Sequence, residues 1–317
     1  MARSRDADHL VAAAGEGDRG ALARLISLIE RGGEDARAVG RLTYVRGGNA
    51  YTVGITGAPG AGKSTLTAGL IGLVRATGEQ VGVLAVDPSS AATGGAVLGD
   101  RVRMQDHALD PGVFIRSMAT RGHLGGLALA TPEAIRALDA AGVGTVLVET
   151  VGVGQVEIEI AGEADTTVVV LTPGAGDAVQ AMKAGLLEVA DLFVLNKADR
   201  PGVVELERDI AAMLDMNMHM GEWRPPSVRT VASTGEGLPE VWGTVAEHRA
   251  YLESSGELGR RRARRVADEL RQIVLHRLEL SVWERCRGAE FDRLRDELLA
   301  RHVDPYTAAD RIVERWA

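Results

Sequence analysis

Short apolar runs alternate with helical segments through the middle of the chain. Between residues 50 and 235, seven runs are rich in β-branched and aliphatic residues: TVGIT, VGVLAVD, VFIRS, GTVLVET, TTVVVLT, LFVLNKAD and SVRTVAS. Several are apolar at consecutive positions, which is typical of strands covered on both faces by helices. The pattern therefore predicts an α/β fold with a mostly parallel sheet. Ligands of such sheets bind at the carboxyl ends of strands, so the chemistry is expected directly after these runs.

The two ends of the chain carry helical patterns instead. Residues 6–45 contain LVAAA and ALARLISLIERG, whose apolar spacing and flanking glycines predict two short helices. After about residue 250 an apolar stripe follows at helical spacing, formed by Val266, Leu270, Ile273, Val274, Leu278 and Leu280. The chain is thus divided into a helical N-terminal extension (1–45), an α/β domain (46–252) and a helical C-terminal arm (253–317). The arm is expected to cover the core or to form a dimer.

A run of arginines, Arg260–Arg265, lies near the start of the arm. Basic clusters are one signature of nucleic-acid binding. Acidic residues follow directly, however, and the net charge of −8 argues against nucleic acid as the main partner. A solvated helix start is therefore the favoured interpretation.

Composition indicates a reducing compartment. Of 317 residues, 45% are apolar, and the single cysteine, Cys286, permits no internal disulfide. The N-terminus lacks an apolar core of signal-peptide length, and no apolar run approaches the ~18 residues of a membrane span. We therefore expect a cytoplasmic protein that does not enter a membrane. Basic residues number 36, yet only three are lysines: Lys63, Lys183 and Lys197.

The first of these lysines lies in a phosphate-binding motif. GAPGAGKST, residues 57–65, follows TVGIT and fits G-x-x-x-x-G-K-[ST] at every fixed position. Glycines let the backbone N–H groups turn towards a phosphate, and the following helix presents its positive N-terminal end. Lys63 is expected to bridge the β- and γ-phosphates, and the Ser64 hydroxyl to bind Mg²⁺. The predicted phosphate-binding residues are Gly57, Gly60, Ala61, Gly62, Lys63, Ser64 and Thr65.

A second lysine lies in N-K-x-D, which follows LFVL as Asn196, Lys197 and Asp199. An Asp carboxylate accepts hydrogen bonds from the N1–H and the exocyclic amine of guanine, whereas adenine leaves that charge unpaired. The motif therefore predicts GTP and GDP rather than ATP as ligands. Lys197 is expected to brace the phosphate loop, and Ala232 to cap the base through backbone N–H groups.

Three acidic residues are candidates for the metal and switch apparatus. Asp87 ends VGVLAVD, Asp100 lies on the glycine-rich segment that follows, and Glu149 lies near the end of GTVLVET. With Ser64 they form the predicted Mg²⁺ set, although Asp100 has a helix N-cap as its alternative role. Glu149 followed by Gly152 is a Walker B arrangement, in which the glycine N–H reaches the γ-phosphate and its loop moves on hydrolysis. The predicted catalytic residues are Lys63, Asp87, Glu149 and Gly152.

Arg121 and Lys183 each have two possible roles. Arg121, in RSMATRGHLGGL, is predicted either to reach a phosphate as an arginine finger or to form a structural ion pair. Lys183 lies in PGAGDAVQAMKAG, which follows TTVVVLT and so starts on the nucleotide side. It is either part of the nucleotide machinery or an ordinary surface lysine.

Several motifs occur in a characteristic order: GAPGAGKST, GGAVLGDRVRM, RSMATRGHLGGL, ETVGVGQ, PGAGDAVQAMKAG and NKAD. Together they resemble the MeaB/ArgK family of SIMIBI-class P-loop GTPases. The resemblance implies a homodimeric G-protein chaperone of an adenosylcobalamin-dependent acyl-CoA mutase, methylmalonyl-CoA mutase above all. Such chaperones gate cofactor loading and protect the mutase. It also implies a GTPase core between an N-terminal helical extension and a C-terminal dimerisation arm.

The resemblance further implies roles for individual residues. A third switch loop, which relays the nucleotide state to the mutase, contains Asp177, Gln180 and Lys183. Two stretches depart from the family pattern. Ala91-Ala92 stand before the Gly-Gly of the first switch, which is expected to loosen it, and Val231 stands where a serine is common.

Two other functions compete with this one. A metal-delivery GTPase of the same class requires a Cys/His relay site, and the single cysteine argues against it. A transport-system-associated kinase requires an acceptor site and ATP, and N-K-x-D argues against ATP. Hydrolysis is expected to be slow for the protein alone, because no residue is clearly placed to orient the attacking water. The partner mutase is expected to accelerate it.

Overall fold

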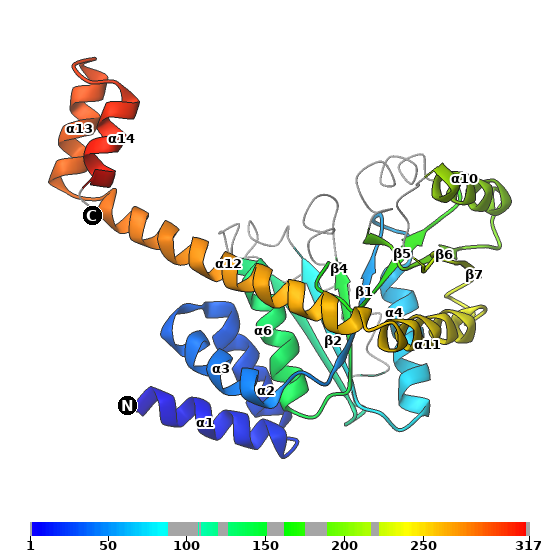
Figure 1. Ribbon diagram of the computed structural model, residues 1–317. Helices are drawn as coiled ribbons and strands as arrows, with labels where there is room; N and C mark the ends of the chain where they lie inside the picture. The colour runs from blue at the N-terminus through cyan, green and yellow to red at the C-terminus, as the bar shows by residue number, and fades with distance from the viewer. Residues whose placement is uncertain are drawn as a thin grey trace. The chain divides into compact units, whose positions relative to one another are not determined.

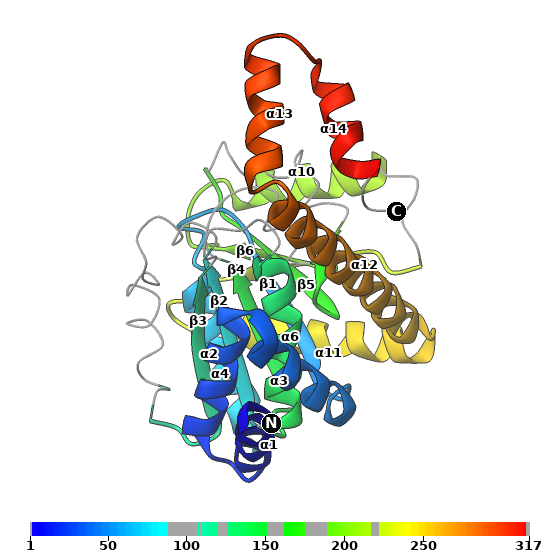
Figure 2. The same ribbon diagram turned by 90° about the vertical axis from the view of Figure 1, so that its left-hand side faces the viewer.

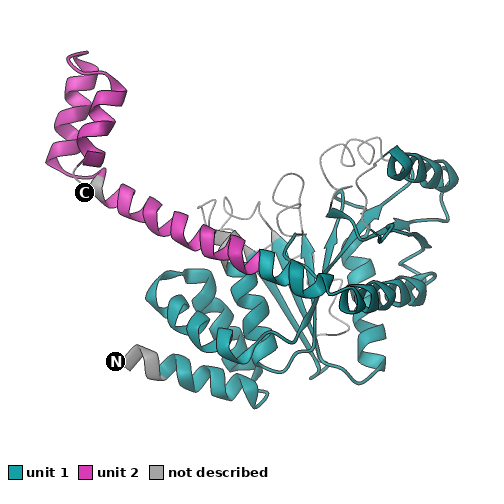
Figure 3. Cartoon of the chain, in the orientation of Figure 1, with its two compact units in different colours: residues 1–264 teal, residues 265–317 magenta. Residues whose placement is uncertain are grey.

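The arrangement of sheet and helices is given by a computed structural model (Figure 1). It describes residues 2–87, 107, 109–119, 126–150, 162–174, 189–216 and 222–314. The chain forms two compact units, Met1–Arg264 and Arg265–Ala317 (Figure 3).

Seven strands form one sheet in the order β3-β2-β4-β1-β5-β6-β7, and every pairing between them is parallel. All seven predicted strands are confirmed: β1 (Tyr51–Thr56), β2 (Val81–Asp87), β3 (Val113–Ala119), β4 (Thr145–Thr150), β5 (Thr166–Leu171), β6 (Leu192–Asn196) and β7 (Ser227–Thr230). Strands β1, β4, β5 and β6 are buried at every position. Burial on both faces explains their unbroken apolar runs.

Alternate side chains of the strands enter different layers of the core. The covering helices include α4 (Lys63–Ala76), α6 (Gly126–Ala140), α10 (Val203–Met216) and α11 (Leu238–Ser254). Val146 and Val148 of β4 pack with α6 and the N-terminal helices, whereas Leu147 packs on the other face with α4 and α11. Figure 2 shows the N-terminal helices and α6 together on one side of the sheet.

Three helices precede the sheet: α1 (Ala2–Gly15), α2 (Arg19–Arg31) and α3 (Gly33–Arg46). The prediction of two helices is wrong, because α3 follows α2 with only Gly32 between them, at a φ of 69°. Few side chains of α3 are buried, so its apolar periodicity is weak. All three helices share one hydrophobic core with α6 and strands of the sheet. The N-terminal extension is therefore packed onto the α/β domain.

The linker between α3 and β1 is held by Asp139 of α6. Its carboxylate accepts hydrogen bonds from three successive backbone N–H groups, those of Gly48, Asn49 (3.0 Å) and Ala50 (3.1 Å). An anion facing consecutive N–H groups fixes the path of the backbone. The extension thus has a defined connection to the first strand.

The order of the strands reverses at β1. Strands β2, β3 and β4 lie on one side of β1, and the chain then crosses to form β5, β6 and β7 on the other side. The carboxyl ends of the strands at such a reversal form the crevice in which α/β proteins bind ligands. Strands β1, β4 and β5 end at this edge of the sheet, where a ligand is therefore expected.

The last helices are α12 (Glu257–Arg285), α13 (Ala289–Leu299) and α14 (Pro305–Val313). The predicted apolar stripe lies on α12, and its members Leu270 and Leu278 are 62% and 52% exposed. Among the described residues, no helix combines the length and apolar character that crossing a membrane requires.

The arginine run near the start of α12 is only partly solvated. The side chains of Arg261 and Arg262 are 29% and 30% exposed, and they form ion pairs with Asp191 and Asp165. Arg264 of the same run faces solvent, with 66% of its side chain exposed. The prediction of a solvated helix start is therefore wrong for two of these arginines, because carboxylates at the amino-terminal edge of the sheet bind them.

Candidate functional site

The phosphate loop follows β1 and requires glycine at two positions. Gly57 has a φ of 139°, and a Cβ atom there would lie 2.1 Å from the carbonyl oxygen of Val170 in β5. Gly62 has a φ of 97°, and a Cβ atom there would lie 2.2 Å from Nδ2 of Asn196 in β6. Glycine alone fits such close approaches in this region of φ. The loop therefore packs directly against the carboxyl ends of β5 and β6.

Lys63 begins α4, and its ammonium lies inside the loop. The Nζ atom donates to the carbonyl oxygens of Gly57 (2.5 Å) and Ala58 (3.2 Å), and the residue is 7% exposed. Gly62 is the N-cap of α4, so the positive end of the helix lies at the same point. A buried ammonium, a helix N-terminus and loop N–H groups together form an anion-binding site of the kind that phosphates occupy.

Ser64 and Glu149 meet at the carboxyl end of β4. The Ser64 hydroxyl donates to Oε1 of Glu149 at 2.5 Å, and both residues are buried. Hydroxyl and carboxylate oxygens are hard ligands, so this pair fits a nucleotide-bound Mg²⁺. Asp87 ends β2, which lies beside β4 with Val86 in register with Thr150. The structure thus brings Ser64, Glu149 and the backbone of Asp87 to one edge of the sheet.

Asn196 connects three parts of the base-binding region. It ends β6, is 3% exposed, and donates from Nδ2 to the carbonyl oxygen of Ala61 at 2.7 Å. Its Oδ1 accepts from the backbone N–H of Ala232 (3.1 Å) and from the Thr230 hydroxyl (3.2 Å). One buried amide therefore joins the phosphate loop, the N-K-x-D segment and the loop after β7. Sequence reasoning gives no signal for this bridging, since its partners are 34 to 135 residues away.

Lys197 contacts the phosphate loop from the same segment. Its φ is 59°, and its Nζ donates to the carbonyl oxygen of Gly60 at 2.6 Å, which is the contact that a brace requires. Asp199 lies two residues further on and is exposed, so its carboxylate is accessible to a base. The remaining loop residue, Thr65, is partly buried in the first turn of α4.

Several predicted site residues lie outside the described residues. They are Asp100, Arg121, Gly152, Asp177, Gln180 and Lys183, together with the side chain of Asp87. The alanines of the first switch, Ala91-Ala92, belong to the same group. The roles given to these residues stay predictions.

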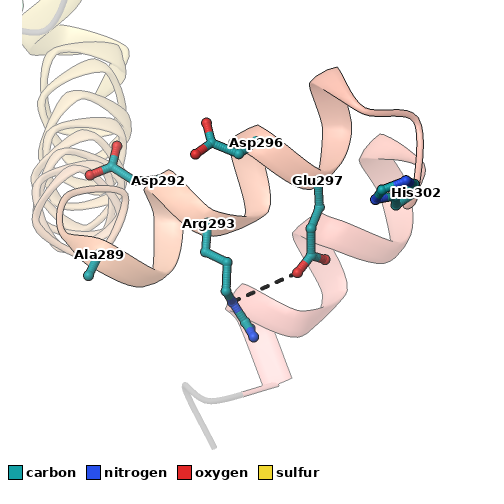
Figure 4. Close-up of a pocket in the computed structure, with 6 residues that line it drawn as sticks. All are labelled: Ala289, Asp292, Arg293, Asp296, Glu297 and His302. Carbon is teal, nitrogen blue, oxygen red and sulfur yellow. Dashed lines mark ion pairs between the residues drawn. The ribbon is translucent and has the colours of Figure 1, made fainter.

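A hollow on the second unit has a different character (Figure 4). It lies along α13 and the turn that follows, and its lining residues are Ala289, Asp292, Arg293, Asp296, Glu297 and His302. Arg293 extends towards Glu297, with 3.9 Å between Nε and Oε1. None of the predicted nucleotide or metal residues lines it.

The family of the chain follows from its similarity to known proteins. A sequence model described as "Methylmalonyl Co-A mutase-associated GTPase MeaB" matches residues 22–287. The chain belongs to the MeaB family. The resemblance inferred from the motifs is therefore confirmed, and the α/β P-loop fold is the fold of a MeaB-family GTPase.

Two sequence relatives and one crystal structure illustrate the similarity of this MeaB-family chain to other proteins. A putative GTPase of Pyrococcus abyssi is 50% identical over 310 residues, which cover 97% of this chain and 96% of that protein. The "Methylmalonic aciduria type A homolog, mitochondrial" of Mus musculus is 39% identical over 216 residues, or 67% of this chain and 52% of that protein. A crystal structure of a LAO/AO transport system kinase matches with a TM-score of 0.73 and 29% identity, covering 97% and 96% of the two chains.

Proposed function

We propose that the protein is a GTP-binding and GTP-hydrolysing chaperone that serves an adenosylcobalamin-dependent acyl-CoA mutase, methylmalonyl-CoA mutase or a relative. It gates cofactor loading into the mutase and protects it. The observation that carries the proposal is the joined site, in which Asn196 and Lys197 of the guanine motif bind the phosphate loop directly. A family described as mutase-associated, and a mouse relative named for methylmalonic aciduria, support the choice of partner.

The described residues divide the work of nucleotide binding. Loop N–H groups and Lys63 neutralise the phosphates, and Asp199 selects guanine. Ser64 and Glu149 are placed to hold Mg²⁺, which offsets the charge of the phosphate oxygens when bound. Because Glu149 accepts the Ser64 hydroxyl, it is directed to the metal position rather than to an attacking water. We therefore expect slow hydrolysis by the protein alone and faster hydrolysis with the mutase bound.

The relay to the mutase is assigned to the segment between β5 and β6. Asp177, Gln180 and Lys183 are the proposed relay residues, and Arg121 is the candidate arginine finger. Lys183→Ala is expected to leave GTP affinity unchanged and to weaken mutase-stimulated hydrolysis. Stimulation that survives this change intact would remove Lys183 from the relay.

The arm (253–317) is proposed to form a homodimer. Leu270, Leu278 and Trp283 of α12 are 62%, 52% and 65% exposed, and contiguous exposed apolar side chains mark protein interfaces. A second copy of the chain would cover these side chains. We also propose a cytosolic location, which the single cysteine suits. Light scattering after size exclusion tests this, with Leu270→Glu/Leu278→Glu expected to give a monomer. A wild-type monomer at micromolar concentration would contradict it.

The hydrolysis rate with and without purified acyl-CoA mutases tests the function. At least one cobalamin-dependent mutase is expected to accelerate GTP hydrolysis, and acceleration by none would refute the chaperone role. Competition against bound GDP tests the base preference separately. ATP displacing GDP as well as GTP does would contradict the role of Asp199.

A second candidate is a kinase of a transport system, because the matched crystal structure carries that title. Transfer of labelled phosphate from a nucleoside triphosphate to a protein acceptor would favour it. Release of all the label as inorganic phosphate would favour the GTPase chaperone.

A further inference from the structure

Two consecutive arginines near the start of α12 bind the amino-terminal edge of the sheet. Arg261 forms a two-point pair with Asp191, with both N–O distances 2.9 Å. Arg262 forms a second pair with Asp165, at 2.8 Å and 3.2 Å. The aspartates are 5% and 1% exposed. The planar fork of a guanidinium matches a carboxylate in this way, and a lysine ammonium does not.

Both aspartates are built into the sheet. Asp165 directly precedes β5, and its carboxylate accepts the backbone N–H of Thr52 in β1 at 3.1 Å. Asp191 directly precedes β6, and its carboxylate accepts the backbone N–H of Thr167 in β5 at 2.9 Å. The arginines therefore bind residues that are fixed at the starts of β5 and β6.

Arg262 also binds the linker that precedes β1. Its guanidinium donates to the carbonyl oxygens of Gly48 and Ala50, each at 2.8 Å. Asp139 accepts hydrogen bonds from the N–H groups of the same linker. Side chains therefore bind both the N–H and the carbonyl groups of this backbone. The start of α12 is thus connected to three neighbouring strands of the sheet, β1, β5 and β6.

The other ends of β5 and β6 reach the phosphate loop. Val170, whose carbonyl oxygen lies against Gly57, is five positions after Asp165. Asn196, whose amide binds Ala61, is likewise five positions after Asp191. At ~3.3 Å per residue, each strand spans about 17 Å between an arginine contact and a loop contact. Residues 168–171 of β5 pair in register with residues 192–195 of β6, so the two strands form one hydrogen-bonded connection.

A buried polar network surrounds Asp191. His248 of α11 lies with Nε2 3.3 Å from Asp191 Oδ1, and its Nδ1 bonds the Thr166 hydroxyl at 2.8 Å. That hydroxyl also bonds the Tyr51 phenol at 2.5 Å. Burial raises the pKa of Tyr51 to about 12, so this phenol stays neutral. Asp191, His248, Thr166 and Tyr51 are all buried, so the carboxylate that Arg261 binds is held by a network of fixed polar partners.

We propose that Arg261 and Arg262 are positioning residues that couple the phosphate loop to the arm helix α12 through β5 and β6. The proposal rests on the proposed function, since the input is the exchange of GDP for GTP. A shift of Gly57 or Ala61 on exchange acts on the strand ends, and the arginines transmit it to the first turns of α12. By thermodynamic reciprocity, a partner held by the arm changes nucleotide affinity by the same factor.

The single cysteine supplies the probe for this coupling. Cys286 directly follows α12 and is partly exposed, so an environment-sensitive maleimide dye labels the chain there alone. In the wild type, replacing GDP by a non-hydrolysable GTP analogue is expected to change the dye emission. Arg261→Gln is expected to bind both nucleotides and to lose most of that change, because its side chain no longer makes the two-point contact with Asp191.

Arg264→Gln is the matched control. This arginine lies one turn further along α12, is 66% exposed and pairs with Glu257 of the same helix. It is expected to keep the wild-type dye response. If Arg261→Gln does not fold, Arg261→Lys replaces it, because that change keeps the charge and removes the two-point geometry.

The outcomes separate the coupling from the proposed function. A wild type that binds no guanine nucleotide removes both. Guanine-nucleotide binding with an unresponsive dye, or a full response in Arg261→Gln or folded Arg261→Lys, overturns the coupling and leaves the GTPase intact. Loss of the response in the Arg264→Gln control as well would also overturn it, since the effect would then belong to any charge change on α12.

Discussion

Replacing Asn196 by alanine tests whether one buried amide holds the nucleotide site together. Three hydrogen bonds of 2.7 to 3.2 Å are lost, to the Ala61 carbonyl, the Ala232 N–H and the Thr230 hydroxyl. Each bond contributes about 1 kcal/mol net, and groups left buried without a partner cost more. The nucleotide-free protein is therefore expected to lose about 3 kcal/mol of unfolding free energy. GDP affinity is expected to fall as well, because the phosphate loop loses its tie to β6.

Urea denaturation of the nucleotide-free protein and titration with a fluorescent GDP analogue measure the two effects. Thr230→Val is the graded control, since it keeps the side-chain shape, removes one of the three bonds and should cost about 1 kcal/mol. Asn196→Asp keeps the acceptor atom but places a buried carboxylate oxygen against the Ala61 carbonyl oxygen, so it should lower both the unfolding free energy and the GDP affinity. A loss below about 1 kcal/mol in Asn196→Ala, with GDP affinity unchanged, would refute the bridging role.

Three further changes test other contacts. Lys63→Arg is expected to fold and to lose at least about a hundredfold in GTP affinity by calorimetry, because a guanidinium does not fit between carbonyl oxygens 2.5 and 3.2 Å from a single nitrogen. Gly57→Ala is expected to cost about 3 kcal/mol in urea denaturation, since its Cβ meets a β5 carbonyl oxygen at 2.1 Å; an unchanged midpoint would contradict this. Burial opposes ionisation of Asp191, but its interactions with His248 and Arg261 outweigh it and hold the pKa of that carboxyl below its usual range. Its stabilising effect is therefore complete above the unfolded-state pKa of ~3.9 and is lost as pH falls through the folded-state pKa. Asp191→Asn should be less stable than the wild type at neutral pH and should flatten the acid limb of a pH–stability curve.

The parts of the fold that the sequence predicts are those encoded locally. The run VVVL is apolar at consecutive positions because β5 is buried on both faces, so the strand can be predicted from this local pattern. The phosphate loop can also be predicted from the sequence. The glycines that adopt its positive φ angles all lie within nine consecutive residues, 57–65. Helix α3 is not predicted from the sequence because its buried residues are only Ala36, Val39 and Thr43. They form too narrow an apolar stripe to show the helical spacing of hydrophobic residues.

The contacts at the amino-terminal edge of the sheet cannot be predicted from local sequence patterns. Arg261 and Asp191 are 70 residues apart, and Arg262 and Asp165 are 97 apart. An aspartate before a strand has the pattern of an ordinary turn residue. An arginine run next to acidic residues has the pattern of a solvated helix. The parallel sheet brings the starts of β1, β5 and β6 together, and there the buried aspartates form ion pairs with partly exposed arginines.

Lysine and arginine bind acceptors of different geometry in this chain. Lys63 and Lys197 each place a single ammonium against backbone carbonyl oxygens of the phosphate loop, at 2.5 and 2.6 Å, where the approach is narrow and one-pointed. Arg261 meets both oxygens of a buried carboxylate at once, a task that requires two parallel N–H groups. Only three of the 36 basic residues are lysines, and two of them make these contacts with the loop. We infer that the shape of the acceptor, and not charge alone, requires lysine there.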